Sequence, residues 1–242
     1  LFVFNFPNND TVMLDAPDRD YYQEVRQNGW DYVHKTKEII TRPVDKRENY
    51  IKRCMGLPGN KLQIIDGNVF IDDKPAQVFN HQMITYNVVT DPGFNFSQDF
   101  LVKHFIRPMS KHQMGYIVTM DVKAAEAVKA LKGVQSVNME VSGKDYVATG
   151  GYSVYPHHPQ MFPWNQDNYG PIVIPAKGMK VALNAENIIM YKRCIETYEN
   201  NKLEIKGNEV FINGAKADSY TFQMDYYWAM GDNRHNSLDS RY

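Results

Sequence analysis

Short apolar runs separated by turn residues limit what this chain can fold into more than any other feature. Asp66-Gly67-Asn68 lies between two such runs and is a hairpin signal, and Asn213-Gly214 is another turn. The pattern predicts a mostly β fold built from short strands. The strand-like runs cover residues 2–6, 49–55, 62–65, 69–71, 181–183, 188–194 and 210–212.

The middle of the chain carries the clearest helix signal. Residues 115–120 are typical of a strand, and Asp121 can cap a helix over residues 122–132 that ends at Gly133. The apolar side chains of this helix share one face, and a further strand follows over residues 134–141. A short second helix is expected over residues 20–28.

These elements predict a small α/β subdomain inserted into a β domain. The stretch from residue 150 to residue 171 is rich in Gly and Pro, which is typical of a loop that returns the chain to the first domain. We expect the β domain to comprise residues 1–80 and 165–242. The inserted subdomain and its return loop would then occupy residues 81–164.

A weak internal repeat relates the two parts of the β domain. A segment beginning at Tyr50 recurs about 140 residues later, so that Lys52 corresponds to Lys192 and Met83 to Met224. With two copies, the repeat does not indicate a solenoid. Either a hairpin unit is duplicated, or both segments are similar because strands and turns favour the same residue types.

The composition excludes several classes of protein. The 27 basic and 28 acidic residues leave a net charge of −1, which does not favour nucleic-acid binding. No apolar run approaches the length of about 18 residues that spans a bilayer. Cys54 and Cys194 define no disulfide framework and are expected to be thiols, and no metal-ligand spacing is present. The pair His157-His158 lies in a Pro-rich loop and is not expected to bind a metal. We expect neither a metal nor a cofactor.

Two motifs far apart in the chain carry the chemical information. The first is Tyr50-Ile51-Lys52-Arg53, followed by Gly56-Leu57-Pro58-Gly59. The second runs from Gly231 to Arg241 with the sequence Gly-Asp-Asn-Arg-His-Asn-Ser-Leu-Asp-Ser-Arg. Composition alone allows the second motif to be a solvated tail, but its side chains also suit an ordered, hydrogen-bonded loop.

Together the motifs resemble those of bacterial type I signal peptidases, membrane-bound proteases with a Ser/Lys dyad. The first motif looks like the lysine box of that family and the second like its C-terminal box, whereas the middle third does not match. Residues 3–7 resemble the short strand between the serine box and the lysine box. The resemblance implies a β-barrel or β-sandwich core, and an enzyme of the bacterial inner membrane that faces the periplasm or exterior.

The first motif favours Lys52 as the general base. In a strand over residues 50–53, Tyr50 and Lys52 point to one side of the sheet. A lysine accepts a proton only as the neutral amine, and burial among apolar groups favours that form. Lys192 has the same local sequence, but no Gly-Leu-Pro-Gly follows it, so we expect a structural role for Lys192.

The resemblance places the nucleophile outside this chain. In the family, the serine lies in a Ser-Met-x-Pro box ahead of the strand that opens this sequence, and no serine here has that context. The resemblance therefore implies a serine upstream of Leu1 and an N-terminal membrane anchor that this chain lacks. We expect this fragment alone to be inactive.

The C-terminal box is expected to support the lysine. By its position in the motif, Ser237 resembles the serine whose hydroxyl orients the catalytic amine. The charged residues of the box are expected to form an ion-pair network near Lys52, with the acids paired to arginines and not to the lysine. The residues of this network are Asp232, Arg234, Asp239, Arg241 and Arg53.

Two positions depart from the family pattern. Asn60 stands where an Asp is common, and it can serve the same turn. His235 occupies a variable position that is usually acidic. A histidine there could tune the loop between about pH 5 and 8, although an exposed side chain without a role is the simpler expectation.

The sequence thus predicts a serine endopeptidase that removes N-terminal signal peptides from exported preproteins. Its partners would be preprotein signal peptides and a membrane. Phe162-Pro163-Trp164 in the return loop is either a membrane contact or, as we expect, an anchor in the core. Two alternatives remain: a self-cleaving repressor-type Ser/Lys protease, which the long insert disfavours, and a preprotein-binding module of the same fold that lacks activity.

Overall fold

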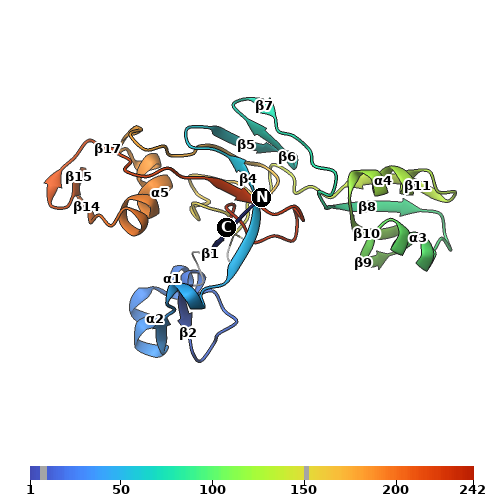
Figure 1. The fold of residues 1–242 in the computed structure, drawn as a ribbon, viewed down its shortest axis with the longest axis horizontal. Coiled ribbons are helices and arrows are strands. Elements are labelled where there is room, and N and C mark those ends of the chain that lie inside the picture. Colours follow the sequence, from blue (N-terminus) through green and yellow to red (C-terminus); the bar gives the residue numbers. More distant parts are fainter. Residues whose placement is uncertain (6–9, 150–152) are drawn as a thin grey trace.

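The computed structural model describes residues 1–5, 10–149 and 153–242, and it confirms a mostly β fold. Within these described ranges, the strands form six small sheets of two to four strands. Figure 1 shows a central region from which three lobes extend, and both chain ends lie in that centre. The end of the predicted strand 2–6, the resemblance at residues 6–7 and the first residues of the return loop lie outside the described residues.

Two sheets form the centre of the molecule. In the first, β4 (Asn49–Gly56) lies between β1 (Phe2–Asn5) and β18 (Trp228–Met230). In the second, β12 (Tyr169–Val173), β5 (Lys61–Ile65), β6 (Asn68–Ile71) and β7 (Lys74–Pro75) follow one another. Asp66 and Gly67 have φ angles of 47° and 77° in the turn between β5 and β6, which confirms the predicted hairpin.

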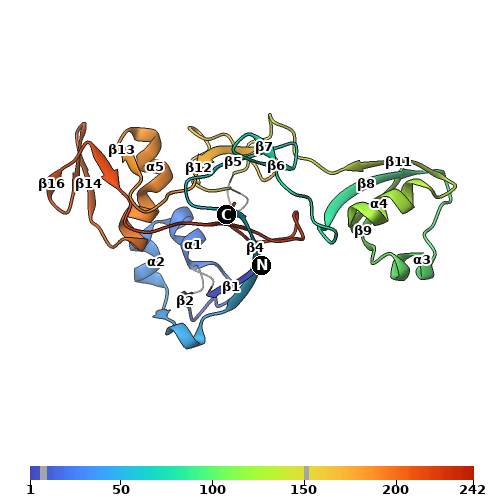
Figure 2. The ribbon, with the colours of Figure 1, turned by 45° about the horizontal axis from the view of Figure 1, so that its top comes forward.

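One lobe is a βαββαβ unit with a core of its own. Its strand order is β11-β8-β10-β9, and neighbouring strands are antiparallel. This arrangement is that of the split βαβ motif. Figure 2 shows α4 lying against the sheet. The elements are β8 (Ile84–Thr90), α3 (Gln98–Lys103), β9 (Arg107–His112), β10 (Gly115–Met120), α4 (Val122–Lys129) and β11 (Val134–Met139).

The sequence predicted only the second half of this lobe. Asp121 caps α4 as expected, since its side chain accepts a hydrogen bond from the Ala124 amide, but the helix ends at Lys129 and not at residue 132. Ser97 caps the unpredicted helix α3 in the same way. The buried apolar side chains of this lobe form one cluster, so it has its own hydrophobic core. The boundaries proposed for the inserted subdomain remain a prediction.

A second lobe corrects the strand prediction for residues 188–194. This segment lies in helix α5 (Ala185–Arg193), which continues into a π-helical turn η4 (Cys194–Tyr198). Asn184 caps α5 by accepting a hydrogen bond from the Asn187 amide. Ile188, Tyr191 and Ile195 are buried, which is a helical spacing that the short apolar run concealed. The strands of this lobe are β13 (Lys180–Ala182), β14 (Leu203–Lys206), β15 (Glu209–Ile212), β16 (Ala215–Lys216) and β17 (Ser219–Thr221).

The third lobe follows β1 and leads into β4. Helix α1 (Tyr21–Asn28) forms where the sequence predicted one, and the Asp20 side chain caps it. Gly29, with a φ of 86°, separates α1 from the unpredicted helix α2 (Trp30–Thr36). The remaining elements are β2 (Thr11–Met13), β3 (Ile39–Thr41) and the 3-10 helix η2 (Val44–Lys46).

The internal repeat corresponds to a structural repeat in the strands, but the two segments that contain Lys52 and Lys192 differ in structure. Asp72 Oδ1 accepts a hydrogen bond from the Lys61 amide, and Asn213 Oδ1 accepts one from the Lys202 amide, each at 2.8 Å. The equivalent bonds favour a duplicated unit for β5–β7 and β14–β16. The segment that precedes the duplicated unit is strand β4 in the first copy and helix α5 in the second.

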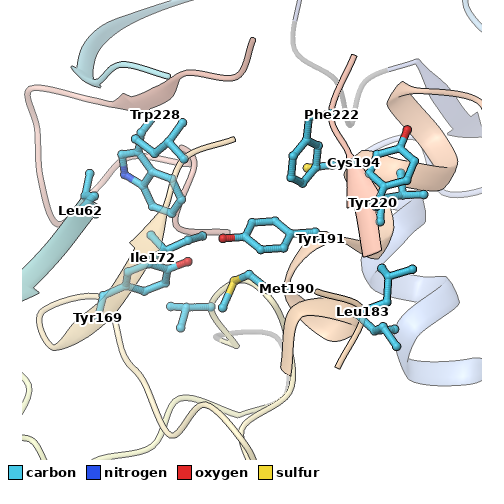
Figure 3. Packing of buried hydrophobic residues seen from close by; sticks show 14 of the residues in the cluster. Leu62, Tyr169, Ile172, Leu183, Met190, Tyr191, Cys194, Tyr220, Phe222 and Trp228 are labelled. Atoms are coloured by element: carbon cyan, nitrogen blue, oxygen red, sulfur yellow. The ribbon is translucent and has the colours of Figure 1, made fainter. Parts of the chain in front are cut away.

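Aromatic side chains join the centre to the second lobe. Figure 3 shows Tyr191 between Tyr169 and Ile172 on one side and Phe222 on the other. The Tyr191 hydroxyl donates to the Val173 carbonyl at 2.9 Å. Phe162 and Trp164 pack against this same cluster, which supports the expected anchor in the core.

The two cysteines were expected to be thiols. Cys54 and Cys194 are free thiols. Among the described residues, none of the helices combines the length and the hydropathy that a membrane span requires.

Candidate functional site

Strand β4 presents Lys52 to the C-terminal box. Lys52 lies opposite Phe2 of β1, and Cys54 lies opposite Ala229 of β18, so the lysine occupies the central strand of its sheet. The side chain is half-buried, and its Nζ lies 5.3 Å from the centre of the Tyr50 ring.

Lys52 and Ser237 meet although 185 residues separate them. Lys52 Nζ donates a hydrogen bond to Ser237 Oγ at 2.8 Å. A Cβ atom on Gly231 would lie 2.1 Å from Ser237 Oγ and 3.4 Å from Lys52 Nζ. Glycine at position 231 is therefore required for the box to approach the lysine this closely.

Arg53, on the opposite face of β4 from Lys52, anchors the start of the box. Its guanidinium donates to both carboxylate oxygens of Asp232, at 2.8 and 2.7 Å. The guanidinium also lies 3.7 Å from the centre of the Phe79 ring. Hydrogen bonding from Arg53 lowers the pKa of Asp232, so the carboxylate is charged and paired away from Lys52.

Arg241 and Asp239 form the buried ion pair of the box. Arg241 Nε and Nη2 each lie 2.9 Å from an oxygen of Asp239, and the two side chains are 2% and 0% exposed. Asp239 also accepts from the Gly231 amide at 3.0 Å, and Arg241 donates to the Arg234 carbonyl at 2.6 Å. The pair thus ties both ends of the loop that carries Ser237.

Arg234 departs from the predicted ion-pair network. Its guanidinium contacts the sulfur atoms of Met230 and Met55, and its described contacts include no carboxylate. Burial, with Arg241 nearby, lowers the pKa of Arg234 to about 10. The network therefore consists of two separate pairs with a buried arginine between them.

The segment that enters the βαββαβ lobe pairs with the box. The Met83 amide donates to the Asp232 carbonyl at 2.8 Å, and the Arg234 amide donates to the Met83 carbonyl at 2.9 Å. Sequence reasoning missed Met83, and no local signal marks a backbone pairing with a loop about 150 residues away.

His235 is not the exposed side chain that we expected. Its Nδ1 accepts from the Thr85 amide at 3.0 Å, and its Nε2 lies 3.1 Å from Asp167 Oδ1. The histidine side chain is 14% exposed and that of Asp167 is 3% exposed. Burial alone would raise the pKa of Asp167, but hydrogen bonds from His235 and the Ser142 amide outweigh it and leave the pKa lowered.

Lys192 lies apart from these residues. It is on helix α5, its side chain is 53% exposed, and its Nζ lies 3.8 Å from Glu196 on the next turn. The sequence likeness to Lys52 therefore does not extend to its surroundings.

An apolar cavity of about 440 Å³ opens beside β1. It is lined by residues of β1, α5, η4, the segment that leads into β18, β18 itself and the end of the box, among them Phe2, Phe4, Tyr191, Cys194 and Tyr227. Phe2 is also the partner of Lys52 across the strands. The cavity therefore adjoins the strand pair that holds the lysine.

The fold and the site define a mostly β protein in which a lysine on a central strand contacts a serine held by an ion-paired loop. The family model described as "Signal peptidase, peptidase S26" matches residues 6–98, which include Lys52. Over these residues the chain is similar to that family.

A curated relative matches part of the chain. The chain is similar to "Signal peptidase I" of Bacillus amyloliquefaciens, with 34% identity over 88 residues. The match covers 27% of this chain and 47% of the relative, so the chain spans about half the length of that protein. No solved structure matches the chain.

Proposed function

We propose that this chain supplies the general base of a signal peptidase that removes signal peptides from exported preproteins at the bacterial inner membrane. The observation that carries the proposal is the 2.8 Å contact between Lys52 Nζ and Ser237 Oγ. Each residue comes from one of the two motifs that resemble the family boxes. The two motifs are thus in direct contact at the Lys52 amine, which supports a joint role in the same reaction.

In this proposal, Lys52 acts as the neutral amine. It takes the proton of a serine hydroxyl while the serine oxygen attacks the scissile carbonyl carbon, and it delivers that proton to the leaving amine as the peptide bond breaks. A water molecule, deprotonated by the same amine, then hydrolyses the serine ester, which releases the signal peptide and returns the proton to the serine oxygen. The nucleophile is the serine that the family resemblance implies upstream of Leu1. Asp232 and Asp239 pair with arginines, which keeps their charge from stabilising the ammonium form of Lys52.

Ser237 is proposed to orient the amine. The hydroxyl accepts one N–H of Lys52, which directs the nitrogen lone pair away from Ser237. A serine-directed acylating probe separates this role from that of a nucleophile. We expect Ser237→Ala in the full-length protein to process substrate slowly and still form the covalent adduct. Loss of the adduct in Ser237→Ala, with its retention in Ser219→Ala, would make Ser237 the nucleophile.

The substrate is proposed to bind as an extended strand. In the described part of the chain, β1 is an outer strand of the sheet that carries Lys52. A peptide can pair with such an edge through its backbone, while pockets select its side chains. Small residues before the cut are expected, as in signal-peptide cleavage sites.

A processing assay tests the function. The full-length protein in detergent is incubated with a preprotein and with a matched preprotein whose small residue before the cut is replaced by a bulky one. We expect cleavage of the first alone, with a product whose N-terminus, read by mass spectrometry, follows the signal peptide. Binding of both preproteins without cleavage would favour the inactive binding module.

A further inference from the structure

His235 joins three segments that are distant in the sequence. The ring belongs to the box loop, Thr85 is the second residue of β8 in the βαββαβ lobe, and Asp167 lies just before β12. The contacts measure 3.0 Å to the Thr85 amide and 3.1 Å to Asp167 Oδ1. Each of the three segments therefore depends on the same imidazole.

The partners of the ring define its protonation state. The Thr85 amide can only donate, so Nδ1 must be an acceptor without a proton. Nε2 must then carry the proton of the neutral ring and donate it to Asp167. A second proton, on Nδ1, would place two N–H groups against each other and break the bond to Thr85.

Asp167 is a fixed point for this contact. Its second oxygen accepts from the Ser142 amide at 2.9 Å, and its backbone carbonyl accepts from the Gly67 amide at 2.8 Å. The Asp167 amide in turn donates to Asn165 Oδ1 at 2.9 Å. The Asp167 backbone is thus fixed by Gly67 and Asn165, and its carboxylate accepts hydrogen bonds from both Ser142 and His235.

The charged groups around the ring are few. Beside Asp167, the small cavity next to His235 is lined by Arg234 and Arg241 from the box. The side chains that face it from the βαββαβ lobe, Ile84 and Met139, are apolar. Protonation of the ring would therefore gain attraction from Asp167, meet repulsion from two arginines and lose the Thr85 bond.

We propose that His235 is a positioning residue that fixes the Ser237 loop against Lys52 by tying it to the βαββαβ lobe and to Asp167. His235 is two residues from Ser237, whose Oγ accepts from Lys52. The Met83 pairing holds the same loop through its backbone, and His235 adds the side-chain contacts. As a role in catalysis, this inference rests on the proposed function.

The variants separate positioning from mere stabilisation. In His235→Gln, the amide oxygen can accept from Thr85 and the amide nitrogen can donate to Asp167, without a second proton. His235→Ala removes both contacts. His81→Gln is the matched control, because the His81 side chain is 90% exposed and its nearest charged group is Asp121 at 3.7 Å.

The assay is preprotein cleavage by the full-length protein across about pH 5 to 8, with kcat and KM measured separately. We expect His235→Ala to lower kcat on the order of 10- to 100-fold with KM little changed, since a 1 Å displacement can cost that much. We expect His235→Gln to restore kcat across this pH range, because its amide replaces both contacts. Full kcat in His235→Ala, or no recovery in His235→Gln when both are folded, would overturn the proposal.

A spectroscopic readout tests the contact without any activity. Nitrogen-15 NMR of the full-length protein should report His235 as the neutral ring with its proton on Nε2, with slow exchange of the Thr85 amide. If the wild type cleaves no preprotein but shows this signature, the proposed function fails and the contact stands. A proton on Nδ1 at neutral pH would overturn the proposal whatever the activity.

Discussion

At the scale of single residues, the site depends on close approach more than on the number of charged groups. Gly231 is the clearest case, because a side chain there would meet Ser237 before the loop could reach Lys52. The sequence identified Lys52, Ser237 and the paired acids because the two motifs carry them. It could not place Asp167 or Thr85, since contacts across distant segments leave no local pattern.

Gly231→Ala should therefore separate the lysine from its serine. A Cβ 2.1 Å from Ser237 Oγ must displace the hydroxyl, so we expect cleavage to fall on the order of 10- to 100-fold. Gly143→Ala is the control, since no atom lies within 4 Å of its added Cβ. Initial rates of preprotein cleavage provide the measurement. Equal rates in the two variants would contradict the account.

The two ion pairs should differ in their contribution to stability. Asp239→Asn leaves Arg241 without its carboxylate in a buried site, which should cost about 3–5 kcal/mol of unfolding free energy. Asp232→Asn acts where Arg53 and Asp232 are 20% and 30% exposed, so a cost of about 1 kcal/mol is expected. Urea unfolding of both variants measures the difference. A larger cost for Asp232→Asn would refute this ranking.

The Asp232 pair should also depend on pH. Because Arg53 lowers the folded-state pKa of Asp232, the carboxylate stabilises the fold above its unfolded value. That contribution is lost as the pH falls through the folded-state pKa, which lies below the ordinary 3.8. The stability difference between the wild type and Asp232→Asn should thus shrink below about pH 4.

At the scale of elements, the strand predictions held wherever turn residues bounded an apolar run. The Asp66-Gly67 hairpin and β10 are examples. The prediction failed for residues 188–194, because the short apolar run at residues 188–191 suits a strand and a buried helix equally. Asn184 was the available signal, since Asn is a preferred helix cap. The split βαβ unit was missed because β8, α3 and β9 were not recognised.

Gly115 tests whether that unit folds on its own core. An added Cβ would lie 1.9 Å from the Val88 carbonyl oxygen on the neighbouring strand, so Gly115→Ala should cost about 3 kcal/mol. We expect fast amide hydrogen exchange within residues 84–139 and retained protection in β5 and β14. Gly143→Ala again serves as the control. A uniform loss of protection would mean that the lobe and the centre share one cooperative core.

At the scale of the whole molecule, the fold places the C-terminal box against strand β4, so that Ser237 contacts Lys52. Lys52 and Lys192 have similar local sequences, yet Lys52 lies on a strand that meets the box and Lys192 does not contact it. Lys192 belongs to a helix, and its described ion-pair partner is Glu196. Lys192 is therefore an internal control for Lys52.

The decisive measurement is preprotein cleavage by the full-length protein with Lys52→Ala, Lys192→Ala and neither change. We expect Lys52→Ala to lower the rate by about 10²- to 10⁴-fold, the usual contribution of a general base. Lys192→Ala should cleave at the wild-type rate. Cleavage that survives Lys52→Ala, or that is lost equally in both variants, would contradict the assignment of Lys52 as the general base.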